Sequence, residues 1–484
     1  METPVTPWNS THPTPLVVDL DGTLLKTDTL VEMVAEGLFN RPLRTLWTMR
    51  AGLRGRATLK AELTRISRLE MAGLPLRSSM MEHLEQQHAL GRPLHLVSAA
   101  DEQTVAKIAA RLGLFDQVHG SDGQTNLKGR HKLQRLQALF PDGFSYAGDS
   151  SADLAVWAGA HGIVLAGASP GVARRARALG KPIEAEMDVG RPALRVWRKA
   201  LRLHQWAKNV LVFVPLLLSG GLSIEKALTC LAGFFLIGVA ASGTYLINDL
   251  ADLASDRQHR SKRNRPLASG DLPLAQGLLA APLMIAFALA GAAVISPAFA
   301  VALVVYVVTT LAYSLRLKRV ALADVMVLAG LYTLRLVMGT VLASATFSPW
   351  LLTFSLFFFF AMSLAKRHVE VTTTDAPREL ELPGRGYRPS DAPLTLSLGI
   401  ATSTASVLVI VEYMMSEAFP SGVYRFPEAL WAAPILLGLW ICRIWLVAHR
   451  GKLDDDPVAF ALRDRLSLLM GAVLGLAFLA ARLL

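Results

Sequence analysis

Hydrophobic and polar residues alternate in two different ways along the 484-residue chain, and the change comes near residue 190. Before it, short apolar runs rich in β-branched residues are separated by stretches of helical periodicity, which predicts an α/β domain. After it, long apolar runs follow one another, each of about the 20 residues that a helix needs to cross a bilayer core. We therefore predict a soluble α/β domain over residues 1–190 and an all-α membrane domain over residues 191–484.

The second part contains nine apolar runs that we interpret as transmembrane helices. They lie near residues 207–223, 226–247, 273–294, 297–315, 321–343, 350–366, 394–416, 429–449 and 467–483. Basic residues gather in alternate loops, whereas the loops between carry almost no charge. Because basic loops stay on the cytoplasmic side, we expect a multi-pass protein of the inner (cytoplasmic) membrane, with the N-terminal domain in the cytoplasm and the C-terminus outside.

Composition agrees with a membrane protein. Hydrophobic residues make up 52% of the chain and charged residues 18%, whereas soluble domains carry about 25% charge. The net charge of +11 falls at the ends of apolar runs, so we expect a membrane as partner and no nucleic acid. The two cysteines, Cys230 and Cys442, lie inside apolar runs, which excludes a disulfide framework and a cysteine-based zinc site. The oligomeric state stays open, including a homo-oligomer.

Polar residues follow three predicted strands of the first domain. The strands cover residues 16–18, 94–97 and 144–147, and the residues that follow them are Asp19 and Asp21, Ser98, and Asp149 with Asp153. Open α/β sheets place their chemistry at the carboxyl ends of strands, so we expect these side chains at one site. Two lysines, Lys128 and Lys132, flank the start of a helix between the last two strands.

This order of motifs (Asp-x-Asp-Gly-Thr, a serine after a strand, a lysine, and Gly-Asp-x-x-x-Asp) resembles the haloacid dehalogenase superfamily of Mg²⁺-dependent phosphatases. The resemblance implies a Rossmannoid domain with a helical cap over about residues 29–88. It implies Asp19 as nucleophile on phosphorus and Asp21 as general acid/base. Ser98 and one lysine would bind phosphate; Lys128 stays open, but we favour Lys132 because it opens the helix. The implied magnesium ligands are Asp19, Asp21, Asp149 and Asp153.

An acidic motif ends the second apolar run, with Asn248 and Asp249 followed by Asp252 and Asp256. Spacings of three and four place the aspartates on one stripe of a helix, where like charges repel. A shared divalent cation explains such stacking, since Mg²⁺ takes carboxylates together with substrate phosphates. The basic residues that would complete a diphosphate site are Lys262, Arg263 and Arg265.

This motif and the run count resemble the UbiA-type intramembrane prenyltransferases, over residues 200–484. The corresponding second region contains Tyr313, Lys318, Asp324 and Arg335. It departs from the aromatic-prenylating members, because no second carboxylate follows Asp324. Asp324 and Arg335 are about three helical turns apart, so we expect them on roughly one face. Arginine inside a membrane span is rare and usually functional; an ion pair that only joins helices is the alternative.

Four short runs narrow the resemblance to the decaprenyl-phosphate phosphoribosyltransferase group. The first run is Gln205 to Asn209, which contains Lys208, and the second is Lys262 to Pro266. The third is Tyr313 to Lys318, and the fourth is Lys366 to Glu370, which contains Arg367. The resemblance implies Mg²⁺-dependent transfer of 5-phosphoribosyl from phosphoribosyl pyrophosphate to a polyprenyl phosphate, with Asp249 and Asp252 as catalytic residues. The fused phosphatase would then remove the 5-phosphate from the lipid product. The alternatives are prenyl transfer to an aromatic acceptor with a separate phosphatase, and a transporter or membrane scaffold.

Overall fold

The computed structural model describes residues 14–122, 127–188, 193–219, 221–374, 377, 379–382, 384–453, 460–461 and 463–483. By their contacts these residues form two compact units, which are treated separately below. Unit 1 takes in the described residues of Met1–Leu201 together with Asp249–Ala280. Unit 2 takes in the described residues of Arg202–Asn248 and Ala281–Leu484.

Unit 1 is built on a six-stranded parallel sheet of order β3-β2-β1-β4-β5-β6. The strands are β1 (Leu16–Val18), β2 (Leu94–Asp101), β3 (Gln117–Ser121), β4 (Ser145–Gly148), β5 (Gly162–Ala166) and β6 (Ile183–Met187). The first strand pairs with two neighbours, Leu16 lying opposite Leu94 of β2 and Ser145 of β4. The chain order therefore reverses at β1, and such switch points open a crevice at the carboxyl ends of the strands.

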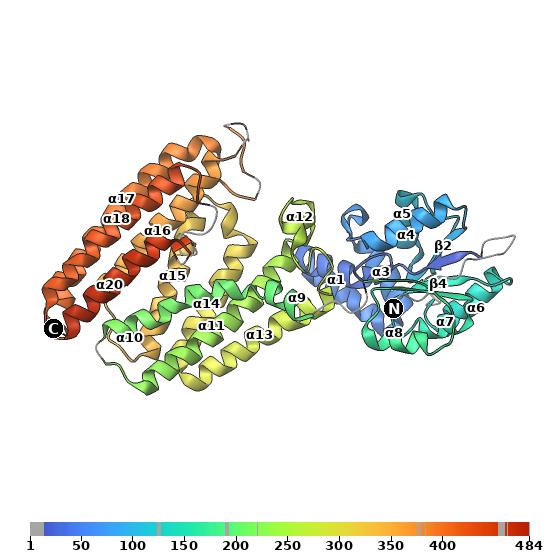
Figure 1. The fold of residues 1–484 in the computed structure, drawn as a ribbon, viewed down its shortest axis with the longest axis horizontal. Coiled ribbons are helices and arrows are strands. Elements are labelled where there is room, and N and C mark those ends of the chain that lie inside the picture. Colours follow the sequence, from blue (N-terminus) through green and yellow to red (C-terminus); the bar gives the residue numbers. More distant parts are fainter. Residues whose placement is uncertain are drawn as a thin grey trace. The chain divides into compact units, whose positions relative to one another are not determined.

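Helices cover both faces of this sheet (Figure 1). Those on one face are α4 (Ser78–Ala89) and α5 (Glu102–Leu112); those on the other are α6 (Arg130–Leu139), α7 (Leu154–Gly159) and α8 (Pro170–Arg177). Alternate residues of β1 supply the two cores, because side chains alternate across a strand. Leu16 and Val18 pack with the first pair of helices, and Val17 packs with the second group. The predicted Rossmannoid fold is confirmed.

A helical insertion follows β1 in the part of the chain expected to form a cap, and it is called the cap below. Its elements are α1 (Thr29–Asn40), α2 (Pro42–Thr48), η1 (Met49–Arg54) and α3 (Arg56–Ile66), followed by the short turn η2 (Met71–Gly73). The cap expected from the sequence extends to about residue 88 and would include α4. Met80 and Leu84 of α4 are fully buried in the core against the sheet, so α4 belongs to the sheet layer.

The rest of unit 1 is α9 (Ala193–Ala200) and the segment from Asp249 to Ala280. This segment contains the end of α11 (Ile224–Ala251), then α12 (Leu253–Gln258), η4 (Lys262–Asn264) and the first turns of α13 (Leu274–Ile295). The sequence assigns it to the membrane domain, whereas its contacts group it with the α/β domain.

Unit 2 is all α-helical, as predicted. Its elements are η3 (Leu203–Phe213), α10 (Val214–Leu218), the larger parts of α11 and α13, α14 (Pro297–Leu315), η5 (Leu317–Arg319), α15 (Ala323–Leu342), α16 (Pro349–Thr372), η6 (Pro389–Asp391), α17 (Ala392–Tyr413), η7 (Met414–Ala418), η8 (Pro427–Trp431), α18 (Ala432–His449) and α20 (Arg465–Leu483). Within the described residues eight helical stretches are long and apolar enough to cross a membrane. The first of the nine predicted spans corresponds to the shorter apolar stretch Leu203–Leu218.

Candidate active sites

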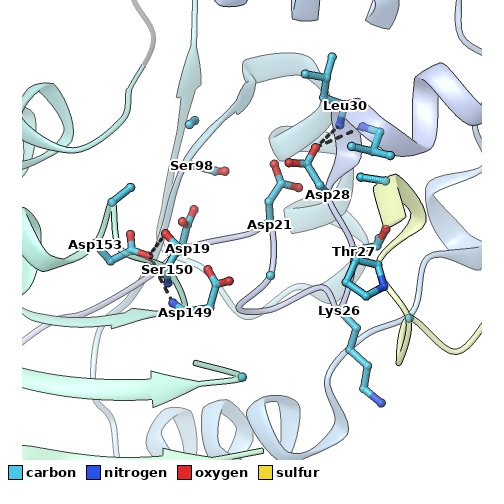
Figure 2. Close-up of a pocket in the computed structure, with 18 of the residues that line it drawn as sticks. Asp19, Asp21, Lys26, Thr27, Asp28, Leu30, Ser98, Asp149, Ser150 and Asp153 are labelled. Carbon is cyan, nitrogen blue, oxygen red and sulfur yellow. Dashed lines mark hydrogen bonds between the residues drawn. The ribbon is translucent and has the colours of Figure 1, made fainter. Parts of the chain in front are cut away.

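The first candidate site lies at the carboxyl ends of the central strands of unit 1 (Figure 2). Asp19 follows β1, Ser98 lies within β2, and Asp149 follows β4. They line a cavity of about 850 Å³ together with Asp21 and Lys132. The parallel sheet thus brings together side chains that are more than a hundred residues apart in the sequence.

Three carboxylates meet in this cavity. Asp19, Asp149 and Asp153 each offer an oxygen, and these oxygens lie within 4.8 Å of one another. Burial and the neighbouring carboxylates of Asp153 and Asp19 raise the pKa of Asp149 well above its ordinary value. Burial likewise raises the pKa of Asp19, opposed by the cation of Lys132. A divalent cation would relieve this repulsion, and oxygen ligands suit magnesium, so the donor set fits the ion.

Lys132 is the lysine that reaches this acidic group. It is buried, and its Nζ lies 3.0 Å from Asp19 Oδ1 and donates to Tyr146 Oη at 2.8 Å. The Tyr146 hydroxyl in turn donates to Asp153 at 3.0 Å. Lys128 also lines the cavity but is exposed. The result is a connected row of polar groups from Asp19 to Asp153.

Asp21 stands apart from the acidic group, although the sequence suggested it as a fourth magnesium ligand. Its carboxylate accepts hydrogen bonds from the backbone N–H and the hydroxyl of Thr29, at 2.9 and 3.2 Å. These bonds turn the side chain toward the start of the cap, because Thr29 opens α1. Burial, with a smaller contribution from the charge of Asp28, raises the pKa of Asp21 to about 7. A carboxyl that titrates near neutrality can both give and take a proton.

Several residues that shape this site carry no motif in the sequence. Arg77 is buried and donates to the carbonyls of Gly22 and Thr23 at 2.7 and 3.0 Å, and it pairs with Asp188 at 3.0 Å. It therefore holds the turn after Asp21. Gly22 has φ +81°, and a Cβ there would lie 2.3 Å from Asp149 Oδ2; only glycine fits this approach. The Asp-Gly-Thr motif indicated the glycine, but no local signal indicated Arg77.

The acidic motif of the second candidate site is held by Arg265. One guanidinium nitrogen lies 3.1 Å from Asp249 and 2.6 Å from Asp256, and both aspartates are buried. The helix predicted for this motif is interrupted, because α11 ends at Ala251 and α12 starts at Leu253, but Asp249 and Asp256 still face the same guanidinium nitrogen. Asp252 lies at this break as the N-terminal flanking residue of α12. Burial raises the pKa of Asp256, although Arg265 opposes the shift.

Arg335 lies in α15 of unit 2, within a helix long enough to cross a membrane. Its guanidinium donates to Asn209 Oδ1 at 3.0 Å, to Tyr306 Oη at 2.8 Å and to the Leu331 carbonyl at 2.7 Å. Arg335 is 5% exposed, and its contacts within the described residues include no carboxylate. The alternative of an ion pair between helices therefore finds no support. A buried, uncompensated cation is costly, and it suits an anionic ligand.

Asp324 forms a different cluster in the same unit, one residue into α15. Its carboxylate lies 2.8 Å from Arg367 and accepts a hydrogen bond from Tyr387 Oη at 2.7 Å. Arg367 also pairs with Glu370, which lies 3.9 Å from Arg385. Arg385 donates to Tyr313 Oη at 3.3 Å. Asp324 and Arg335 share one helix as predicted, but their side chains have separate partners.

The remaining predicted residues fall into two groups by unit. In unit 1, Lys262 and Arg263 are exposed on η4. In unit 2, Lys208 lies on η3 with its Nζ 5.4 Å from the centre of the Tyr332 ring, a ring that Arg335 also approaches. The other residues of unit 2, all partly exposed, are Asn248 in α11, Lys318 in η5 and Lys366 in α16.

Comparison with known proteins gives two family matches. Residues 210–469 match the UbiA prenyltransferase family, and residues 16–157 match the haloacid dehalogenase-like hydrolases. Protein y4nM of Sinorhizobium fredii is 43% identical over 96% of this chain and 91% of its own length. Decaprenyl-phosphate phosphoribosyltransferase of Mycobacterium tuberculosis is 32% identical over 55% of this chain and 87% of its own length. A solved UbiA homologue from Archaeoglobus fulgidus, bound to DMAPP and Mg²⁺, is 17% identical with a TM-score of 0.46, over 59% of this chain and 97% of that one.

Proposed function

Since the chain belongs to the UbiA prenyltransferase family and is a multi-pass membrane enzyme with a haloacid dehalogenase-like domain, we propose that it performs two consecutive reactions. The first transfers 5-phosphoribosyl from phosphoribosyl pyrophosphate to a polyprenyl phosphate. The second removes the 5-phosphate from the lipid-linked product. Both would take place at the cytoplasmic face of the inner membrane.

The observation that carries the transferase proposal is the likeness to decaprenyl-phosphate phosphoribosyltransferase over 87% of that enzyme's length. The neighbourhood of Asp324 agrees with it. Both carboxylate oxygens of Asp324 are engaged by protein groups, and the four residues after it are apolar. This helix therefore carries one acidic residue and a cation, Arg335, instead of the second acidic pair of aromatic-prenylating relatives.

In the transferase reaction the bond from ribose C1 to the pyrophosphate oxygen breaks, and a bond from C1 to an oxygen of the lipid phosphate forms. The lipid phosphate is already an anion, so no general base is required. Asp249, Asp252 and Asp256 would hold magnesium, which neutralises the charge of the departing pyrophosphate. The cations of Lys262, Arg263 and Arg265 belong to the same segment. Lys208, Lys318, Arg335 and Lys366 of unit 2 would bind phosphate groups. Positioning and charge stabilisation would supply most of the rate.

In the phosphatase reaction a carboxylate oxygen of Asp19 attacks phosphorus, and the ribose 5-oxygen leaves with a proton from Asp21. Water then cleaves the aspartyl phosphate as Asp21 takes a proton back. Lys132 and Ser98 would bind the phosphate. Magnesium held by Asp19, Asp149 and Asp153 would screen the repulsion between the attacking carboxylate and the phosphate.

The test uses the purified full-length protein with ribose-labelled phosphoribosyl pyrophosphate, a polyprenyl phosphate and Mg²⁺. We expect ribosylated lipid without a 5-phosphate, and no lipid product from Asp249→Ala. Asp19→Asn should still form the lipid product, but with its 5-phosphate retained. Absence of ribosylated lipid refutes the transferase proposal. A parallel assay with a polyprenyl diphosphate and 4-hydroxybenzoate tests aromatic prenylation, and a prenylated product there would favour that alternative.

A further inference from the structure

The segment from Asp249 to Ala280 is joined to the phosphatase cap by a buried ion pair. Arg257 of α12 donates to both carboxylate oxygens of Glu32 in α1, at 2.5 and 3.0 Å. The Glu32 side chain is fully buried, and that of Arg257 is 8% exposed. Arg257 also donates to the carbonyl of Ala268, which joins the ion pair to a later turn of the same segment. Such a bidentate, desolvated pair is stable only while both partners are present, because either charge alone would be buried without a counter-charge.

The same segment approaches the loop that follows β1. Asp271 lies 3.4 Å from the Nζ of Lys26. The neighbouring Gly270 has φ +72°, and a Cβ there would come within 2.6 Å of the Lys26 Cβ. The backbone at residue 270 therefore packs directly against the loop that carries the catalytic motif. Figure 2 shows Thr27 of this loop near Asp28, with the Lys26 side chain extending away from Asp19, Asp149 and Asp153.

The segment also supplies part of the wall of the phosphatase cavity. The carboxylates of the first candidate site line this cavity. Pro273, Leu274 and Ala275 line it as well, with Leu30 and Val31 of the cap. Its volume of about 850 Å³ is in the upper part of the range of about 300–1,000 Å³ for small-molecule sites. It is far more room than a phosphate group needs. The lining thus combines carboxylates and cationic side chains with a group of apolar residues from the segment and the cap.

The apolar wall is continuous with a membrane helix. Leu274 and Ala275 belong to the first turn of α13, which is long and apolar enough to cross a membrane. Its 22 residues span about 33 Å at 1.5 Å per residue, close to the whole thickness of a bilayer core. Its first turn therefore belongs near the membrane surface, where phosphate esters of lipids are presented.

We propose that this segment of the transferase completes the phosphatase pocket and makes it selective for a phosphate monoester carried on a lipid. The first candidate site takes the phosphate, and the wall of Pro273, Leu274 and Ala275 takes the apolar part. The inference rests on the proposed phosphatase activity and adds the substrate class. It does not depend on ribose being the group that carries the phosphate.

Two esters that differ only in an acyl chain test the selectivity in the full-length protein embedded in lipid nanodiscs. They are glycerol 3-phosphate and 1-oleoylglycerol 3-phosphate. We expect kcat/KM to be at least tenfold higher for the acylated ester, and Ala275→Trp to bring the ratio of the two values close to one by filling the wall. Leu279→Trp is the matched control, because Leu279 is exposed on the same helix and does not line the cavity; it should keep the full ratio.

Equal kcat/KM for the two esters in the unmodified protein would overturn the proposal, as would turnover of neither ester. An equal loss for both esters in Ala275→Trp would also overturn it. These results differ from failure of the two-step function, in which the ribosylated lipid keeps its 5-phosphate while the acyl-chain preference persists.

The contact itself has an independent test. Zero-length carbodiimide coupling should join Lys26 to Asp271 as an amide that mass spectrometry detects, and Asp271→Asn should abolish it. Arg257→Ala should reduce the yield of this product severalfold, whereas Arg260→Ala, an exposed neighbour, should not. An unchanged yield in Arg257→Ala, or no coupling in the unmodified protein, would overturn the proposal.

Discussion

Replacing Asp324 by asparagine removes the carboxylate charge from a buried ion pair in unit 2. Asp324 and Arg367 lie 2.8 Å apart, with side-chain exposures of 0% and 2%. Tyr387 donates to the other oxygen of Asp324 at 2.7 Å and accepts from the backbone N–H of Leu322. Burial and the hydrogen bond to Asp324 raise the pKa of Tyr387, so its hydroxyl stays protonated.

The magnitude follows from what each change leaves behind. Loss of one partner of a buried pair costs about 3–5 kcal/mol. Arg367 keeps a second carboxylate, Glu370, which is 34% exposed, so we expect about 3 kcal/mol for Asp324→Asn. Tyr387→Phe removes the hydrogen bond to the charged carboxylate, worth about 1.5–3 kcal/mol, and also the bond that the backbone N–H of Leu322 donates to the hydroxyl. The matched control is Glu381→Gln, because Glu381 pairs with Arg388 on the surface, with side-chain exposures of 60% and 47%. Such a pair contributes at most about 1 kcal/mol.

Thermal unfolding in one detergent at one scan rate measures these differences as apparent Tm, because membrane proteins often unfold irreversibly. The expected order of destabilisation is Asp324→Asn, then Tyr387→Phe, then Glu381→Gln. The double variant of Asp324 and Tyr387 should lose less than the sum of the single losses, since the two side chains are in contact. An Asp324→Asn protein as stable as Glu381→Gln would refute the reasoning.

Three further predictions concern single side chains. Lys132→Ala should lower phosphatase kcat about 100-fold or more, because it removes the cation beside Asp19. Phosphoribosyl transfer should be unchanged, and an equal loss of both activities would contradict the role of Lys132 in the phosphatase site. Arg335→Met should keep the apparent Tm within a few degrees, since neutral replacements of buried charges are often tolerated, yet lower transferase kcat/KM about 100-fold; full activity would contradict a role in binding phosphate. Asp464 pairs with Arg443 and has its pKa lowered to about 2. The ionised carboxylate therefore stabilises the fold above the unfolded pKa of about 4, and this stabilisation is lost as the pH falls toward 2. Asp464→Asn should lower the apparent Tm at pH 6 and have little effect near pH 2. An effect that persists at pH 2 would contradict an origin in the charge of Asp464.

The chemistry of the phosphatase site could be predicted from sequence because its residues follow strand ends. Asp19, Ser98 and Asp149 stand directly after or within short β-branched runs, and parallel strands bring their carboxyl ends to one edge. The preference for Lys132 over Lys128 rested on its place at the start of a helix, and the structure shows Lys132 buried beside Asp19. Arg77 and Tyr146 could not be found this way, because each acts through partners more than a few residues away.

The acidic motif shows where local spacing was insufficient. Intervals of three and four predicted one helical stripe, but the helix breaks at Asp252 and Arg265 joins the first and last aspartates. A pattern of charges does not encode a break that depends on the packing of the residues around it. The segment just before α20 is a similar case. The sequence suggested no role for Asp464, whereas the structure shows it accepting from the backbone N–H of Ser467 at the start of α20; Asp456 lies outside the described residues.

The sequence by itself determined the division into an α/β part and a membrane part, because periodicity and the length of apolar runs are local properties. It also determined which residue types are available for phosphate and metal chemistry. Only the tertiary structure decided which partners the charged groups have. Asp324 is engaged by Arg367 and Tyr387, Arg335 has neutral partners, and Arg257 binds the cap of the phosphatase. The side-chain partners in these pairings lie from 29 to 225 positions apart, and burial, which no local pattern specifies, sets the strength of each.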